Sequence, residues 1–113
     1  MILATVHANG VLTINDSASA IVVAGSVKHE TVKFLFPDNW KAYRKTAVFS
    51  AYGVEPVSIE LDDNDNELYI REDECYIPSA VLSGDNFYVS VTGACGADAL
   101  KKATTTKAKI EVL

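Results

Sequence analysis

Apolar and polar residues alternate through the centre of the chain, between residues 31 and 61. Three runs place an apolar residue at every second position: Val32, Phe34 and Phe36; Ala47, Phe49 and Ala51; Val57, Ile59 and Leu61. This period of two is typical of a half-buried strand, because successive side chains of a strand point to opposite faces. Pro37-Asp38-Asn39 predicts a turn after the first run. We therefore expect three strands here, paired antiparallel through short corners without crossover helices.

The flanking segments predict further strands and turns. Ile2 to Ile14 predicts a β-hairpin, since Asn9-Gly10 supplies the two positive-φ residues of a type I′ turn. Before the centre we also expect a short buried strand at Ala20 to Ala24. The later expected elements are a helical turn at Trp40 to Arg44, a polar turn at Asp62 to Asn66, a short strand at Leu68 to Arg71, an extended piece at Cys75 to Pro78, a helical turn at Ser79 to Leu82 capped by Ser79, a strand at Phe87 to Thr92, a loop at Gly93 to Asp98 and a last strand at Thr104 to Leu113.

These elements predict an all-β fold. Seven to nine short strands, with only one or two single-turn helices, are typical of an immunoglobulin-like antiparallel β-sandwich. The 113 residues suffice for one such domain, spanning residues 1–113. The N-terminus lacks the basic and long apolar regions of a signal peptide, and the longest apolar runs are too short to cross a bilayer. We expect no export signal and no membrane partner.

Charge is unevenly distributed along the chain, whose net charge is −5. Nine acidic residues and one basic residue lie between Glu55 and Glu74, whereas lysine and arginine cluster elsewhere, at Lys41, Arg44 and Lys45 and again at Lys101, Lys102, Lys107 and Lys109. A chain of net negative charge is repelled by the phosphate backbone of nucleic acids, so we expect no nucleic-acid partner. The opposite clusters indicate either a head-to-tail contact with a copy or a neighbour, or simply a solvated surface.

Cys75 and Cys95 form no CxxC motif and have no histidine at metal-ligand spacing. Trp40 precedes both cysteines, whereas the immunoglobulin tryptophan lies between the paired cysteines. Two reduced, semi-buried side chains, a disulfide between strands and a reactive thiol all remain open.

The acidic turn offers one metal candidate, since Asp62, Asn64 and Asn66 fall at the first, third and fifth positions of a calcium loop. The rest of the pattern fails, because Glu67 replaces the required glycine and Asp73 replaces the bidentate glutamate. The stretch is therefore either a plain polar turn or a weak surface calcium site. We expect no resident metal or other cofactor.

Catalytic motifs are absent from the sequence. His7 and His29 have no metal-binding or general-base spacing, and there is no GxSxG elbow and no glycine-rich phosphate loop after a strand. The clustered carboxylates lie on a turn and do not predict a glycosidase cleft. We therefore expect that the protein is not an enzyme.

Aromatic residues are better candidates for contacts with a partner. The tyrosines mostly fall on the outward phase of their strands, and exposed tyrosines bind protein surfaces and sugar rings efficiently. Our interface candidates are Trp40, Tyr43, Tyr52, Tyr69 and Tyr88.

The order of several segments resembles a known family. These segments are Phe36 followed by Trp40, Lys45-Thr46-Ala47-Val48-Phe49, Val57-Ser58-Ile59-Glu60-Leu61-Asp62-Asp63, Cys75-Tyr76-Ile77-Pro78 with Val81-Leu82, and Tyr88-Val89-Ser90-Val91-Thr92-Gly93. Together they resemble small immunoglobulin-like modules of tail or baseplate structural proteins in phages and prophages of Gram-positive, often gut-dwelling, bacteria. The resemblance covers residues 31–93. This chain departs from the family at Ser79-Ala80, at Ser90, in the insertion from Glu67 to Glu74 and in its lysine-rich final strand.

The resemblance implies a non-enzymatic virion component, made in the host bacterial cytoplasm and located in the virion. Its partners would be other phage structural proteins in a tail, baseplate or fibre, and we also expect several copies of the chain to associate as a homo-oligomer. Two alternatives stay open: an immunoglobulin-like module that binds a host cell-surface glycan or protein, and a decoration protein of the phage head.

Overall fold

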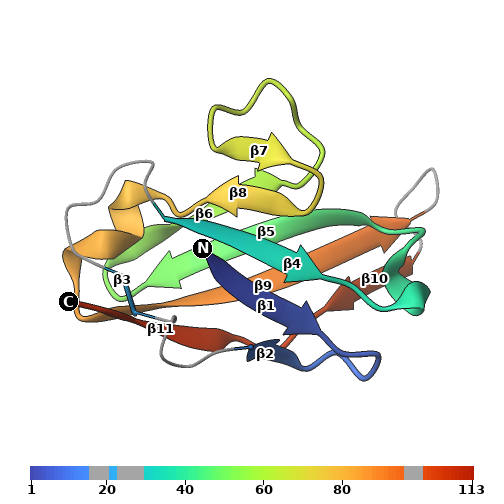
Figure 1. Ribbon diagram of the computed structural model, residues 1–113, viewed down its shortest axis with the longest axis horizontal. Coiled ribbons are helices and arrows are strands. Elements are labelled where there is room, and N and C mark those ends of the chain that lie inside the picture. The colour runs from blue at the N-terminus through green and yellow to red at the C-terminus, as the bar shows by residue number, and fades with distance from the viewer. Residues whose placement is uncertain (16–20, 23–29, 96–100) are drawn as a thin grey trace.

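Two β-sheets form the protein in the computed structural model, which describes residues 1–15, 21–22, 30–95 and 101–113 (Figure 1). Sheet A has the order β2-β1-β4-β8-β7, with bounds β2 Leu12–Ile14, β1 Ile2–Val6, β4 Thr31–Leu35, β8 Glu74–Tyr76 and β7 Tyr69–Arg71. Sheet B has the order β3-β11-β9-β5-β6, with bounds β3 Ile21–Val22, β11 Ala108–Val112, β9 Asn86–Cys95, β5 Arg44–Ala51 and β6 Val54–Glu60. The strand β10, Lys101–Thr104, also pairs with β9. The all-β prediction is confirmed.

Strand pairing differs in part from the expected antiparallel arrangement. The pairs β1–β4 and β3–β11 are parallel, and the other pairs are antiparallel. The three central runs form strands as predicted, but β4 belongs to sheet A and β5 and β6 belong to sheet B. The chain therefore crosses between the sheets at the corner after Leu35, where the sequence predicted a simple turn.

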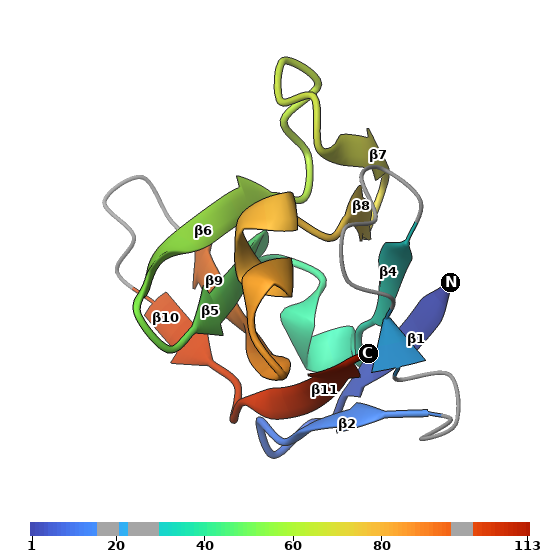
Figure 2. The ribbon, with the colours of Figure 1, turned by 90° about the vertical axis from the view of Figure 1, so that its left-hand side faces the viewer.

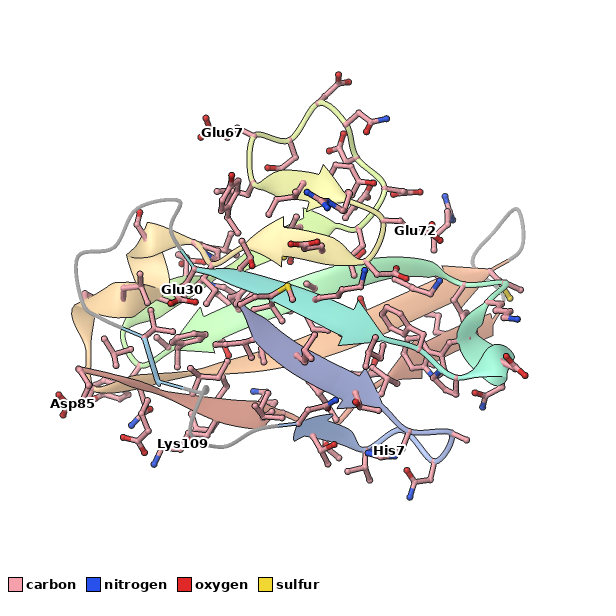
Figure 3. The ribbon with its side chains drawn as sticks, in the orientation of Figure 1. His7, Glu30, Glu67, Glu72, Asp85 and Lys109 are labelled. Atoms are coloured by element: carbon pink, nitrogen blue, oxygen red, sulfur yellow. The ribbon has the colours of Figure 1, made fainter. Side chains whose placement is uncertain are left out.

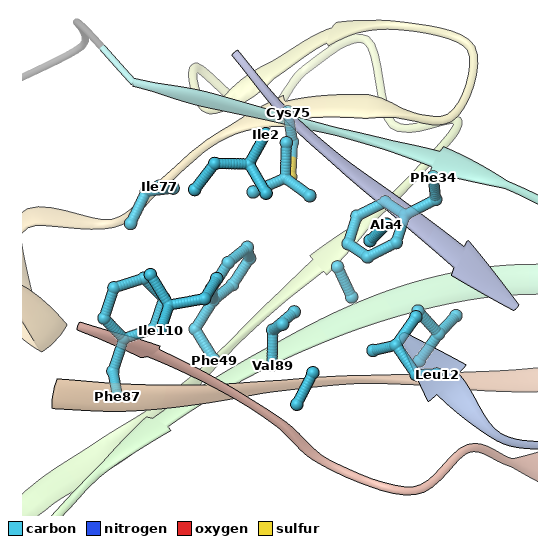
Figure 4. Close-up of a cluster of buried hydrophobic side chains, with 14 of the residues drawn as sticks. Ile2, Ala4, Leu12, Phe34, Phe49, Cys75, Ile77, Phe87, Val89 and Ile110 are labelled. Carbon is cyan, nitrogen blue, oxygen red and sulfur yellow. The ribbon is translucent and has the colours of Figure 1, made fainter. Parts of the chain in front are cut away.

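The core lies between the two sheets and is built from the inward phase of their strands (Figure 4). Ile2, Phe34 and Cys75 of sheet A face Phe49 and Phe87 of sheet B, and all five are at most 1% exposed. The burial of Phe34, Phe49 and Phe87 confirms the inward phase that the alternation predicted for them. Because protein interiors are close-packed, these side chains fix the spacing of the sheets.

The corner between β4 and β5 contains a 3-10 turn, η2, at Asp38–Trp40. The Trp40 ring is 2% exposed and lies 5.6 Å from the Phe36 ring and 5.3 Å from the Tyr43 ring, measured between centroids. The predicted helical turn at Trp40 to Arg44 is therefore wrong in position. The turn begins directly after Pro37, whose backbone is extended (φ −76°, ψ 168°), and Arg44 already begins β5.

The β1–β2 hairpin is confirmed, but its turn is not type I′. The His7 N–H donates to Val11 O and the Gly10 N–H donates to His7 O, both at 2.9 Å. Gly10 has φ +87°, whereas Asn9 has no positive φ. This geometry is a three-residue loop, in which a type I turn is followed by a left-handed glycine.

The predicted last strand, Thr104 to Leu113, is divided into β10 and β11 by a kink at residues 105–107. Thr105 Oγ1 accepts the Val91 N–H at 2.9 Å and so replaces a backbone acceptor in the ladder. Thr106 donates its N–H to Gly10 O at 3.0 Å and accepts the Leu12 N–H on Oγ1 at 3.1 Å. These bonds tie sheet B to the β1–β2 hairpin of sheet A.

Three other expectations need correction. The predicted loop at Gly93 to Asp98 is wrong for residues 93–95, which belong to β9, and its remainder lies outside the described residues. Ser79 does not cap the 3-10 turn η3, Ser79–Ser83, because Pro78 occupies that position and no side-chain cap bond forms.

The described residues contain eleven strands, more than the seven to nine expected, because the final strand is split and very short edge pieces also pair. The strand predicted at Ala20 to Ala24 is seen as β3, and its other residues are not described.

The described residues contain 3-10 turns and no α-helix. None of their helical segments has the length and apolar character needed to cross a bilayer.

We predict that Gly93→Ala destabilises the fold by about 1–3 kcal/mol, as overpacking does. A Cβ at this position would lie 2.8 Å from Trp40 Cζ3 and 3.0 Å from Tyr43 Cβ, and the buried tryptophan cannot move aside. Urea unfolding measures the change. Gly84→Ala is the control, since its Cβ meets no atom closer than 4.0 Å. In a double-mutant cycle, Gly93→Ala should cost less in the Trp40→Phe background, and equal costs in both backgrounds would contradict the contact.

Candidate interaction surfaces

The five predicted interface residues occupy different environments. Trp40 is a core residue at 2% exposure, so its prediction as a contact residue is wrong: the ring is covered by Phe36 and Tyr43. Tyr43 is half-buried against that ring. Tyr52 is fully exposed at the turn between β5 and β6, whereas Tyr88 on β9 is 40% exposed. Tyr69 is half-buried on β7.

These tyrosines do not gather into one patch. Tyr43 precedes β5 and Tyr52 follows it, so the two tyrosines are nine residue steps, or about 30 Å, apart along the strand. Tyr69 belongs to sheet A, in the β7–β8 hairpin that projects from the body in Figures 1 and 2. The tyrosine phase found in the sequence therefore does not define a common surface.

The outer face of sheet B carries a row of hydroxyl side chains that the sequence did not reveal. The register aligns Thr104 with Thr92, Thr92 with Thr46, and Thr46 with Glu60, across β10, β9, β5 and β6. Two positions along, Lys102 pairs with Ala94, and Ala94 pairs with Arg44. Because side chains of one phase share a face, these residues lie together on the solvent side. The row could be found only once the pairing was known.

Two adjoining hollows lie on this outer face. One, of about 290 Å³, is lined by Arg44, Thr46, Thr92, Gly93, Ala94, Lys102, Ala103 and Thr104. The other, of about 300 Å³, is lined by Arg44, Lys45, Thr46, Glu60, Asp62 and Ala94. Among the described residues, Arg44 and Lys102 have no ion-pair partner. The small Ala94 side chain leaves room between the two cations, so the face can accept polar or anionic groups of a partner.

A third hollow, of about 290 Å³, lies at the opposite end of β5. It is lined by Ala51, Tyr52, Ser83, Gly84, Asp85 and Asn86. Figure 3 shows Asp85 at that end of the molecule. An exposed aromatic ring beside carboxylate and amide groups can stack on a sugar ring and bond its hydroxyls.

Comparisons of this chain with protein-family models, with curated proteins and with solved structures find no match. Its interaction surfaces are therefore inferred from their own geometry and charge.

The acidic turn after β6 is held by its own side chains. Asp63 Oδ1 accepts the Asp65 N–H at 3.0 Å, and Asn66 Oδ1 accepts the Leu68 N–H at 2.9 Å. Asn66, one of the calcium candidates, thus already uses its side-chain oxygen. Asp62 is exposed and lines the hollow beside Arg44, and Asn64 is exposed. Within the described ranges, no three His, Cys, Asp or Glu residues gather as a metal site. The weak calcium site at Asp62, Asn64 and Asn66 stays a prediction.

Among the described residues, His7 and the two cysteines line none of these hollows. His7 is exposed, with Nε2 2.9 Å from Thr13 Oγ1, and His29 lies outside the described residues. The two cysteines are unpaired, so the disulfide alternative is wrong: Cys75 is fully buried on β8 in sheet A, and Cys95 is half-buried at the end of β9 in sheet B.

Asp73 is a strained and partly buried acid at the β7–β8 turn. Its φ of 61° lies in the left-handed region, and its carbonyl accepts the Phe34 N–H at 2.8 Å. Burial raises the pKa of its carboxyl, and the nearby Lys45 charge opposes that rise. The Asp73 carboxyl therefore lies where desolvation disfavours its charged form.

We predict that the two thiols differ in reactivity. Burial, reinforced by the Glu74 charge, raises the pKa of Cys75 to about 12, so its thiolate is scarce at mildly alkaline pH. A colorimetric disulfide reagent should titrate Cys95 in the native protein and Cys75 only after denaturation. Cys95→Ser should abolish the native reaction. Equal rates for both thiols would contradict this prediction.

We predict that Asp73→Asn stabilises the protein at neutral pH. A raised folded-state pKa contributes stability below the unfolded-state pKa, and this contribution is lost as pH rises through the folded-state value. The asparagine avoids that loss and also tolerates left-handed φ. Its advantage in urea unfolding should therefore shrink well below the ordinary aspartate pKa. Asp65→Asn, in the exposed turn, is the control, and an advantage that does not change with pH would refute the assignment.

Proposed function

We propose that this protein is a non-enzymatic structural module of a phage or prophage virion. It acts in tail, baseplate or fibre assembly through contacts with other structural proteins. It is made in the cytoplasm of the host bacterium and functions in the virion. The resemblance of residues 31–93 to such modules supports this proposal.

We also propose that the two sheets form an immunoglobulin-like sandwich. Strands β4, β8 and β7 are neighbours in sheet A, and β11, β9, β5 and β6 are neighbours in sheet B. Taken in chain order as B, C, C′, D, E, F and G, these strands have the neighbours found in variable-type immunoglobulin domains. The hairpin β1–β2 and the short strands β3 and β10 are then additions to that plan. The two parallel pairs, β1–β4 and β3–β11, each involve one of these added strands, so the immunoglobulin-like strands pair only antiparallel with one another.

The outer face of sheet B is the observation that carries the assembly role. Thr104, Thr92 and Thr46 are held in register, and Arg44 and Lys102 flank Ala94 without ion-pair partners among the described residues. The β-branched threonine side chains have few rotamers, so they lose little entropy when a partner binds. Such a face favours repeated protein contacts over chemistry.

The hollow beside Tyr52 favours a second candidate, binding of a host cell-surface glycan. Its exposed ring lies next to Asp85 and Asn86, which can bond sugar hydroxyls. A decoration protein of the phage head would use the same physics as the first candidate.

We predict that the tagged protein captures virion subunits through its sheet B face. The bait is incubated with a lysate of the strain that encodes it, after prophage induction, and bound proteins are identified by mass spectrometry. Tail or baseplate subunits are expected, and Arg44→Glu should reduce their recovery. Lys41→Glu is the control, since Lys41 is also exposed but lies in the corner and pairs with Asp38 at 3.2 Å.

Other outcomes of this capture are equally decisive. Retention of envelope polysaccharide alone, abolished by Tyr52→Ala, would replace the assembly role with the glycan-binding candidate. Retention of head subunits alone would assign the protein to head decoration. Recovery that is unchanged in Arg44→Glu would exclude the sheet B face as the contact.

A further inference from the structure

Sheet B is polarised in charge from one edge to the other. Strand β6, at one edge, carries Glu55 and Glu60 and no basic residue. Strand β9 carries no charged residue, and β5 is charged only at its start. Across β9 from β5 lie β10 and the kink that follows it, with Lys101, Lys102 and Lys107. The acidic and basic edges are therefore three strand spacings, about 14 Å, apart.

The side chains at both edges are available to a partner. Glu55, Glu60, Lys102 and Lys107 are exposed, and none has an ion-pair partner among the described residues. By contrast, Lys109 on β11 already faces Glu111, with Nζ 3.8 Å from the carboxylate oxygen. We define the acidic side as Glu55 and Glu60, and the basic side as Lys102 and Lys107.

The backbone of the acidic edge is poorly suited to pairing with another strand. The Leu61 N–H donates to Lys45 O, so the backbone N–H and C=O groups of Val57 and Ile59 also point toward β5. The backbone groups of Pro56, Ser58 and Glu60 therefore point away from β5, toward the open edge. Pro56 has no N–H to donate, and Glu60 O already accepts the Asp63 N–H at 3.3 Å. A contact at this side therefore depends on side chains.

We propose that the acidic side of one copy docks on the basic side of a second copy. This inference rests on the proposed assembly role and names its partner as the same chain. Continuing sheet B in one orientation would set β6 of the next copy antiparallel to β10, since β10, β9, β5 and β6 alternate in direction. The outer faces then stay on one side, and Glu60 of one copy can approach Lys102 of the other.

Charge sign determines the symmetry of this contact. A two-fold axis through either side would place like charges together, which disfavours an isologous dimer. The contact is therefore head-to-tail, and repetition produces a ring or a filament. Because exposed ion pairs are individually weak and screened by salt, association should depend steeply on ionic strength.

Sedimentation velocity of the full chain tests this. At about 0.01 M salt, where the Debye length is about 30 Å, the sedimentation coefficient should rise with protein concentration. At about 1 M salt, where it is about 3 Å, the protein should be monomeric. Lys102→Glu with Lys107→Glu, or Glu55→Lys with Glu60→Lys, should each abolish the low-salt association.

Mixing the two charge-reversed variants gives the decisive result. One variant then has two acidic sides and the other two basic sides, so an equimolar mixture should recover association that neither shows alone. Lys41→Glu with Arg71→Glu is the control, because it changes net charge as much as the basic-side variant and leaves both sides intact; it should associate like the native chain.

Three outcomes would overturn the inference: a native chain that is monomeric at low salt, charge-reversed variants that associate like it, or a mixture that stays monomeric. If the native chain is monomeric while the capture experiment still yields virion subunits, this inference fails and the assembly role stands. If both fail, the assembly role is lost as well. Circular dichroism of each variant separates misfolding from loss of the contact.

Discussion

The close approach of Trp40 and Tyr43 to Gly93 is the contact on which the arrangement of the two sheets depends. It lies at the corner where the chain leaves sheet A and enters sheet B, and it buries the Trp40 ring at that end of the core. Since only a glycine allows the two aromatic side chains so near the β9 backbone, the corner fixes where β5 starts opposite β9. The threonine row on the outer face follows from that register.

Several separate features limit the ability of the edge strands of the two sheets to pair with other strands. Pro56 removes a donor from β6, and β7 and β2 are three residues long. Thr106 bonds Leu12 and Gly10 on the side where β2 approaches the final strands. Such features discourage uncontrolled strand addition, which exposed edges otherwise invite. Contacts with other molecules are thereby left to side chains, whose charge can select the partner.

The sequence predicts the core well because burial follows from a local period. Phe34, Phe49 and Phe87 are placed inward by alternation alone, and each is at most 1% exposed. Residues that depend on distant pairing cannot be found in this way. Trp40 has no alternating neighbours to show that it is buried, and the kink at Thr105 depends on a bond to Val91, fourteen positions away.

The candidate surfaces show the same limit more strongly. The opposite charge clusters are visible in the sequence, but which edges carry them depends on the strand order. Thr46, Thr92 and Thr104 are scattered over three segments and meet only through the register of β5, β9 and β10. For the tyrosines the sequence suggested a shared surface that the structure does not have. A shared outward phase does not show which sheet, or which end of a sheet, a residue occupies. Phase is a local property, whereas a surface is a property of the pairing.

The two candidate surfaces of sheet B are compatible in space, which bears on how the two candidate functions relate. A side-by-side contact uses β6 and β10, whereas the Tyr52 hollow lies beyond the end of β5. Copies related by continuation of the sheet would keep one orientation, so each would present its Tyr52 at the same end of the assembly. Weak binding at each copy then becomes strong binding by the array, through effective concentration. In that case glycan recognition would depend on assembly, because only the array presents many Tyr52 hollows at one end. The glycan affinity of a single copy would then underestimate that of the assembly.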